Sequence, residues 1–353
     1  MPSLFRRRVL GGLIALVGAL LAVKLNTPLP WLLGPLIAVA SFRLASMPVA
    51  CSVPIRCTGQ WAIGASLGLY FTPQIVVMIS SYWPLVLAGV LFAFLLGALG
   101  SLLLHRLGGV DIRTAWFSSA IGGASEMTAL SEKYGGRADL VASAHSLRIL
   151  MVVVIIPFAY QAWGVSGLDT LLTGPKEVHV GGLFLLIVMT ALGGLLFQRL
   201  GISNSWVLGP LLVSVLLTTT GNELSALPDA FSKAGQLFIG WSLGDKYRQA
   251  FFRAAPRFLA TVFLFTSFAL LLALLLSFLL DGFSAIPFPT LMLAYAPGGI
   301  AEMAITAKVL HLGVPIVTAF QVSRMAMVVV CTGPLYEHII TRFFLAQVPS
   351  QDP

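Results

Sequence analysis

The sequence has 353 residues, of which 58% are hydrophobic and only 10% are charged, with a mean hydropathy of +0.95. This composition excludes an ordinary soluble domain and indicates an integral membrane protein. The net charge of +8 does not indicate a nucleic-acid partner, because the basic residues form short clusters between apolar segments, as is typical of cytoplasmic loops in membrane proteins.

The first apolar segment follows the basic cluster Arg6-Arg7-Arg8, an arrangement that also occurs in secretory signal peptides. We expect this segment to remain as a structural helix, because "LVGALL" near Leu16 has a counterpart in "ALGGLL" near Ala191. Helices are then predicted at about 8 to 25 and 29 to 45, followed by a shorter third helix and by the long uncharged span from Trp83 to Leu104.

A glycine-broken segment and a last helix follow. The motif "GGASEM" begins at Gly122 and carries Glu126, and the next helix contains His145 and Arg148. In the third helix, the small-residue spacing of Gly64 and Gly68 lets helices approach closely, and packing is its predicted role. A solvated turn is predicted between the broken segment and the last helix, at Glu132, Lys133, Arg137 and Asp139.

The same pattern occurs twice in the chain. "WLLGPL" at Trp31 recurs as "WVLGPL" at Trp206. Three further matches have almost the same spacing along the chain: "GQWAIGASLG" and "GQLFIGWSLG", "GGASEM" and "GGIAEM", and Arg148 and Arg324. The second copy has predicted helices at about 182 to 198 and 205 to 220. We therefore predict two membrane repeats, residues 1–173 and 174–353, joined near Gly174-Pro175.

The charges beside the long helices predict that the two repeats have opposite orientations. Residues 70 to 82, before the first long helix, carry no charge, and basic residues follow that helix; before the second long helix, 258 to 280, the basic residues come first. Short basic loops face the cytoplasm. The residues concerned are His105, Arg106 and Arg113 after the first long helix, and Lys246, Arg248, Arg253 and Arg257 before the second.

The predicted fold is therefore all-α: a polytopic membrane protein of two inverted repeats, each with about five transmembrane helices and a glycine-broken or re-entrant segment. Whether these segments cross the bilayer fully or re-enter stays open at this point. The Arg6-Arg7-Arg8 cluster predicts a cytoplasmic N-terminus and a multi-pass protein of the bacterial inner membrane.

Inverted repeats with matching interrupted helices are typical of secondary transporters, which bind substrate and ions at half-helix ends near the bilayer midplane. A break frees backbone groups inside the membrane, and the N-terminus of the following half-helix attracts anions. A charged residue at the centre of a membrane helix costs roughly 2.5 to 3.5 kcal/mol, so its presence implies a partner or a function. The predicted substrate-binding and ion-binding residues are Gly122, Gly123, Glu126, Arg148, Gly298, Gly299, Glu302 and Arg324.

Two interpretations of these charged residues stay open. In the functional one, the glutamates carry protons or cations and the arginines anchor an anion. In the structural one, ion pairs between Glu and Arg hold each broken segment against the last helix. His145 lies one helical turn before Arg148 and could relay protons. Its counterpart is Gln321, however, so a polar residue satisfied by a neighbouring helix is the alternative.

The duplicated "GGxxEM" segments, the "WxLGP" turns and the "GQxxIGxSLG" helices resemble the AbrB-type membrane protein family of bacteria, over nearly the whole chain. The resemblance implies an inner-membrane protein, in a family labelled as regulators of gene expression or as ammonia monooxygenases and unrelated to the small soluble DNA-binding regulator of the same name. The residues support neither label, because the five histidines are dispersed and no segment is long and polar enough for a soluble domain.

The sequence therefore predicts a secondary active transporter and not an enzyme. The expected transporter moves a small solute and is driven by a proton or sodium gradient. The paired arginines favour an anionic solute. The alternative is a membrane-embedded regulator of gene expression without transport. The expected partners are the lipid bilayer and a small-molecule or ion substrate, with no nucleic acid, and a homodimer is one option. Because the three cysteines are scattered, we expect no metal and no cofactor.

Overall fold

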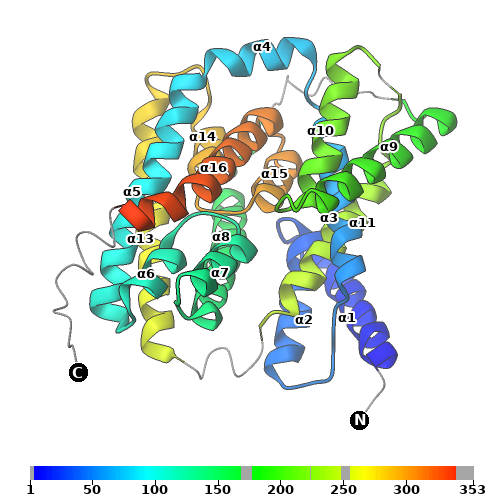
Figure 1. Ribbon diagram of the computed structural model, residues 1–353. Coiled ribbons are helices and arrows are strands. Elements are labelled where there is room, and N and C mark those ends of the chain that lie inside the picture. Colours follow the sequence, from blue (N-terminus) through cyan, green and yellow to red (C-terminus); the bar gives the residue numbers. More distant parts are fainter. Residues whose placement is uncertain (1–3, 168–176, 223, 248–254, 339–353) are drawn as a thin grey trace, which may run out of the picture.

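The computed structural model describes residues 4–167, 177–222, 224–247 and 255–338, and the regular structure within these ranges is helical (Figure 1). This confirms the prediction of an all-α protein. The predicted repeat junction at Gly174-Pro175 and the basic residues Arg248 and Arg253 lie outside the described residues.

The helices follow one another in two series of the same order. The first series is α1 (Leu4–Lys24), α2 (Pro30–Leu44), α3 (Val53–Gly68), α4 (Pro73–Ser81), α5 (Trp83–Gly108), α6 (Ile112–Ser119), α7 (Ala124–Lys133) and α8 (Ala138–Ala162). The second series is α9 (Val180–Arg199), α10 (Ser205–Thr219), α11 (Asp229–Gly244), α13 (Pro256–Asp281), α14 (Phe288–Tyr295), α15 (Ile300–Val309) and α16 (Val314–Leu335). Each helix of the first series other than α4 has a described counterpart in the second, and the spacing between their first residues is nearly constant along the chain. The residues that correspond to α4 lie largely outside the described ranges.

Proline, glycine and capping residues set many of these boundaries. Pro30, Pro73 and Pro256 are the first residues of α2, α4 and α13, where the fixed φ angle suits the helix and the missing N–H is not needed. Gly109 ends α5 in the left-handed conformation, with φ at 70°. Asp111 then caps α6, because its carboxylate accepts a hydrogen bond of 2.9 Å from the Thr114 backbone N–H.

Five described helices are long and apolar enough to cross a membrane by themselves: α5, α8, α9, α13 and α16. A sixth span is reached if α3 and α4, which are bent by 87° at their junction, count as one. The two shorter apolar helices are α2 and α10. The chain is therefore a helical membrane protein. The larger number of crossings expected from the sequence stays a prediction for the shorter and more polar helices.

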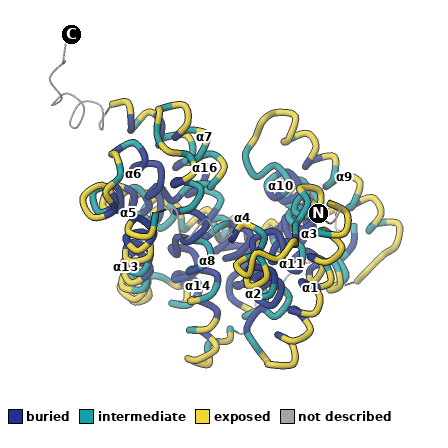
Figure 2. Tube along the Cα trace, turned by 90° about the horizontal axis from the view of Figure 1, so that it is seen from below, coloured by how far each residue is buried: buried dark blue, intermediate teal, exposed yellow. Residues whose placement is uncertain are grey.

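The helices gather in two groups that each mix the two series, as Figures 1 and 2 show from two directions. The six-helix group contains α1, α2, α3, α9, α10 and α11, and the eight-helix group contains α5 to α8 and α13 to α16. The short helix α4 passes between them at the top of Figure 1. Within each group, helices of the first series pack directly against helices of the second, as α2 does with α11, α3 with α10 and α5 with α13.

Glycines make the close contacts of the six-helix group. A Cβ atom added to Gly68 on α3 would lie 2.6 Å from the carbonyl oxygen of Leu211 on α10. A Cβ atom added to Gly244 on α11 would lie 2.7 Å from the carbonyl oxygen of Leu36 on α2. The small-residue spacing thus has the packing role that the sequence predicts. The sequence does not reveal that each glycine helix packs against a helix of the other series.

The long helices α5 and α13 run antiparallel. At one end, the Arg257 side chain donates a hydrogen bond of 2.8 Å from Nε to the carbonyl oxygen of Leu107, so the start of α13 lies beside the end of α5. Further along, Gly108 faces Phe258 and Gly100 faces Phe265. Residue numbers therefore fall along one helix as they rise along the other.

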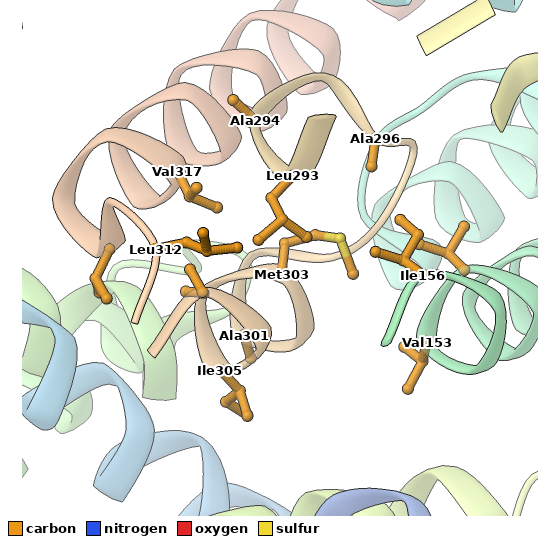
Figure 3. Close-up of a cluster of buried hydrophobic side chains, with 14 of the residues drawn as sticks. Val153, Ile156, Leu293, Ala294, Ala296, Ala301, Met303, Ile305, Leu312 and Val317 are labelled. Carbon is orange, nitrogen blue, oxygen red and sulfur yellow. The ribbon is translucent and has the colours of Figure 1, made fainter. Parts of the chain in front are cut away.

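The largest apolar core surrounds the break between α14 and α15. In Figure 3, Leu293 and Met303 come from the two sides of this break and point toward one another, with Ile156 of α8 close to the Met303 side chain. Leu293 and Met303 are fully buried. Close packing of this kind fixes the interrupted backbone between neighbouring helices.

Candidate functional site

Both glycine-rich segments interrupt a helix. The helix α6 ends at Ser119 and α7 begins at Ala124, with Gly123 as its N-cap; in the second series α14 ends at Tyr295 and α15 begins at Ile300, with Gly299 as its N-cap. The breaks therefore lie where the sequence predicts them. Each break frees carbonyl groups at the end of one half-helix and N–H groups at the start of the next.

Glu126 and Glu302 are the third residues of the half-helices α7 and α15. Each carboxylate folds back over its own N-cap glycine, so a Cβ atom on Gly123 or Gly299 would collide with a glutamate oxygen. A larger residue at either position would therefore push the carboxylate out of this place. A negative charge at this place interacts favourably with the positive end of the helix dipole.

The two arginines hold the carbonyl groups that the breaks set free. Arg148 donates from Nη1 to the carbonyl oxygen of Ala120 (2.9 Å) and from Nη2 to that of Gly122 (3.2 Å). Arg324 makes the equivalent bonds to Ala296 (2.6 Å) and Gly298 (2.7 Å). The side chains of Arg148 and Arg324 are buried, at 3% and 5% exposure. Each guanidinium therefore satisfies backbone oxygens inside the apolar protein.

In the described structure, the two glutamates are not paired with the two arginines. Among the described residues, no salt bridge joins Glu126 or Glu302 to Arg148 or Arg324. Glu126 accepts a hydrogen bond from the hydroxyl of Ser203, in the turn between α9 and α10, through its Oε1 atom. Its Oε2 atom is buried without a hydrogen-bond partner in the described structure. The geometry therefore does not contain the Glu–Arg ion pairs of the structural interpretation.

A cavity of about 130 Å³ lies between the two helix groups. With the liquid volume of about 30 Å³ per water molecule, it has room for a few waters or a small solute. Both breaks line it, and so do α3, α10 and α11 of the six-helix group. The structure brings together at this cavity Gly122, Gly123, Glu126, Arg148, Gly298, Gly299, Glu302 and Arg324.

The charged lining of the cavity is predominantly basic. Arg56 on α3 and Lys246 at the end of α11 add two positive charges to those of Arg148 and Arg324, against the two negative charges of Glu126 and Glu302. With all six groups ionised, the formal charge is +2. The Nε atoms of both buried arginines have no hydrogen-bond partner in the described structure. The cavity lining thus attracts an anion.

His145 lies apart from this cavity. Its Nε2 atom is 2.9 Å from the carbonyl oxygen of Phe117, and the ring is fully buried. At the matching place in the second series, Gln321 donates a hydrogen bond of 2.7 Å to the carbonyl oxygen of Leu293. The two side chains thus make the same contact between the last helix and the first half-helix, and the structure does not bring His145 to the cavity.

The sequence analysis did not assign Arg56, Lys246 or Ser203 to the site, and it considered Lys246 only as a loop charge. They were missed because their counterparts in the other copy are Ser232, Tyr70 and Pro28, so a search for repeated motifs passes over them. The available signal was a basic residue close to each "GQxxIGxSLG" motif: Arg56 lies just before the first motif and Lys246 just after the second. Within the described ranges, no three His, Cys, Asp or Glu side chains are grouped as ligands of a metal ion would be.

These features define a helical membrane protein with a charged cavity between interrupted helices. The chain belongs to the AbrB family, whose model, described as "Transition state regulatory protein AbrB", matches residues 31–340. This match confirms the resemblance inferred from the duplicated motifs.

Two relatives match over nearly their whole length. One is "Putative regulator AbrB" of Escherichia coli (strain K12), 25% identical over 338 residues that cover 94% of this chain and 97% of the relative. The other is "Uncharacterized protein YhjN" of Bacillus subtilis (strain 168), 24% identical over 349 residues that cover 92% of this chain and 90% of the relative.

Proposed function

We propose that this protein is a secondary active transporter of a small anionic solute, coupled to a proton or sodium gradient across the bacterial inner membrane. The observation that carries the proposal is the cavity between the two helix groups, which both broken segments line and whose ionised side chains sum to a positive charge. Transporters of this plan bind solutes where interrupted helices meet.

The proposal includes two inverted repeats, residues 1–173 and 174–353. The antiparallel packing of α5 and α13, which occupy the same place in the two series, supports it. In Figure 1, α5 begins at the top, beside α4, and α13 begins at the bottom. The chain's N-terminal end, with Arg6-Arg7-Arg8, also lies at the bottom, which supports a cytoplasmic N-terminus on that side.

Glu126 is the best candidate for the group that takes up the coupling ion. One of its oxygens accepts from Ser203 and the other has no partner in the described structure, so the carboxylate can receive a proton without breaking an ion pair. Protonation removes one negative charge from the cavity lining, which strengthens the attraction for an anion. By linkage, the anion and the proton then favour each other's binding, which is the requirement for symport.

The proposal is tested with purified protein in liposomes. We expect small carboxylates or inorganic anions, and not amines, to raise the melting temperature, because a ligand at a hundred times its Kd stabilises the folded state by about 2.7 kcal/mol. Glu126→Gln should still bind the anion but lose proton-coupled accumulation. The matched control is Asp139→Asn, since Asp139 is an exposed carboxylate that pairs with Arg137 and does not line the cavity. Unchanged coupling in Glu126→Gln would contradict the assigned role.

The name of the E. coli relative favours a second candidate function, a membrane-embedded regulator without transport. In that case the charged groups at the breaks are purely structural. No stabilisation by any small solute, together with no solute flux in liposomes, would support this function over transport.

A further inference from the structure

Lys308, near the end of α15, bridges the two helix groups. Its Nζ atom donates to the hydroxyl oxygens of Ser66 on α3 (2.6 Å) and Ser232 on α11 (3.2 Å). It also lies 5.7 Å from the centre of the Tyr70 ring, just after α3. On this side of the cavity, α15 is therefore held against the six-helix group by a cation and three neutral polar side chains.

The matching helix α7 is in a different environment. On α15 every residue from Ile300 to Ala307 is buried, whereas on α7 only Met127 and Ser131 are. The helix α15 packs against α3, and no comparable packing joins α7 to α11 among the described helices. In Figure 1, α15 lies toward the top and α7 toward the bottom. The protein is thus closed between the two groups on the α15 side and open on the α7 side.

The residues of the Lys308 contact all have counterparts in the other copy, at the same offset along the chain as that between Arg148 and Arg324. The hydrogen-bond and ring partners of Lys308 are neutral, and the carboxylate of Asp229 is near enough to interact with its charge. The set of counterparts contains one anion and two cations. The four pairs are Lys308 and Glu132, Ser66 and Ser242, Ser232 and Arg56, and Tyr70 and Lys246.

Among the described residues, Glu132 forms no salt bridge with Arg56 or Lys246 in this structure. Glu132 is exposed at the end of α7, and Lys246 is exposed at the cavity. Arg56 and Ser242 also line the cavity, and the Nε atom of Arg56 has no hydrogen-bond partner in the described structure. Neither Glu132 nor Lys246 takes part in a salt bridge among the described residues. Opposite charges therefore flank the opening on the α7 side.

We propose that Glu132 pairs with Arg56 and Lys246 in a second conformation of the protein, in which α7 closes against the six-helix group as α15 does here. In that conformation Lys308 leaves Ser66 and Ser232, and the cavity opens on the α15 side. The two contacts exclude each other because both breaks belong to the same eight-helix group. The inference rests on the proposed transport function, since a carrier needs two openings that alternate.

Thiol crosslinking tests the proposed contact. In a protein whose three cysteines (Cys51, Cys57 and Cys331) are replaced by alanine, Glu132→Cys and Lys246→Cys are combined and treated with a short bifunctional thiol reagent. The control pair is Lys133→Cys with Lys246→Cys, because Val309, the counterpart of Lys133, is exposed and makes no such contact. We expect crosslinking of the first pair only, and an increase of about fivefold or more when Lys308→Met removes the present contact.

A second measurement covers the case in which the cysteine pair disturbs folding. The cavity residue Ser242 is replaced by cysteine and labelled with a maleimide that cannot cross the membrane. Glu132→Gln should raise the labelling, because it removes the partner that closes this side, while Asp139→Asn should leave it unchanged. Equal crosslinking of both cysteine pairs, or labelling that does not respond to Glu132→Gln, would overturn the proposal.

Neither measurement needs a solute, so the two proposals fail separately. A crosslink that depends on Lys308 in a protein without solute flux removes transport and leaves the Glu132 contact. Solute flux in a protein that never gives the crosslink removes the contact and leaves transport.

Discussion

Replacing Arg324 with methionine tests whether the guanidinium holds the second break. The substitution keeps most of the apolar side chain and removes three donated hydrogen bonds of 2.6 to 2.7 Å, to the carbonyl oxygens of Ala296 and Gly298 and to Oε1 of Gln321. Hydrogen bonds to a charged group contribute roughly 1.5 to 3 kcal/mol each, and removing the buried charge recovers several kcal/mol of desolvation. We expect a net loss of about 3 to 5 kcal/mol in the free energy of unfolding.

Arg148→Met provides the matched comparison, because Arg148 makes only two such bonds and they are longer, at 2.9 and 3.2 Å. Its loss should be smaller, about 2 to 3 kcal/mol. Arg324→Lys should recover only part of the lost stability, since a single ammonium cannot bond both carbonyls as the planar guanidinium does. Unfolding in mixed detergent micelles measures these differences. A stable Arg324→Met protein, or one less affected than Arg148→Met, would refute the reasoning.

Two further substitutions follow from the packing. Gly244→Ala places a Cβ atom 2.7 Å from the Leu36 carbonyl oxygen and should cost about 1 to 3 kcal/mol, while Gly97→Ala, with its nearest atom at 3.8 Å, should be neutral or stabilising by up to about 1 kcal/mol; thermal melting compares them. His145→Gln should preserve both stability and proton coupling, because Gln321 makes the same contact in the second series, whereas His145→Leu leaves the Phe117 carbonyl unpaired and should cost about 1 to 3 kcal/mol. Loss of coupling in a stable His145→Gln protein would instead support a proton relay through His145.

The repeated motifs and the apolar spans predicted both breaks and the bounds of α1, α2, α5, α9, α10 and α13 to within a few residues, but not the short helix α4. This succeeded because glycine pairs and prolines act locally on the backbone, and two copies of each signal reinforced one another. Composition and the long uncharged spans were enough to predict a membrane protein, because apolar segments of this length are typical of transmembrane helices.

The partners of the charged residues could not be predicted in the same way. Arg324 and Glu302 lie on different helices, and a carbonyl at a break attracts a guanidinium as a carboxylate does. From the sequence, Arg324 could pair either with a glutamate or with the carbonyl groups at a break. In the structure it donates hydrogen bonds to the carbonyl oxygens of Ala296 and Gly298. Arg56 and Lys246 line the cavity only because α3 and α11 pack near the breaks. The repeat spacing along the sequence does not predict this packing.

Glycines of each series pack against helices of the other series, and this affects how the protein can fold during its synthesis. The surface of α3 around Gly68 is complementary to α10, which the ribosome makes only after the whole first series is complete. Until then this surface faces lipid or the insertion machinery, because its intended neighbour does not yet exist. The first half of the nascent chain therefore cannot reach its final packing alone, and truncated products should be recognised by the membrane quality-control proteases.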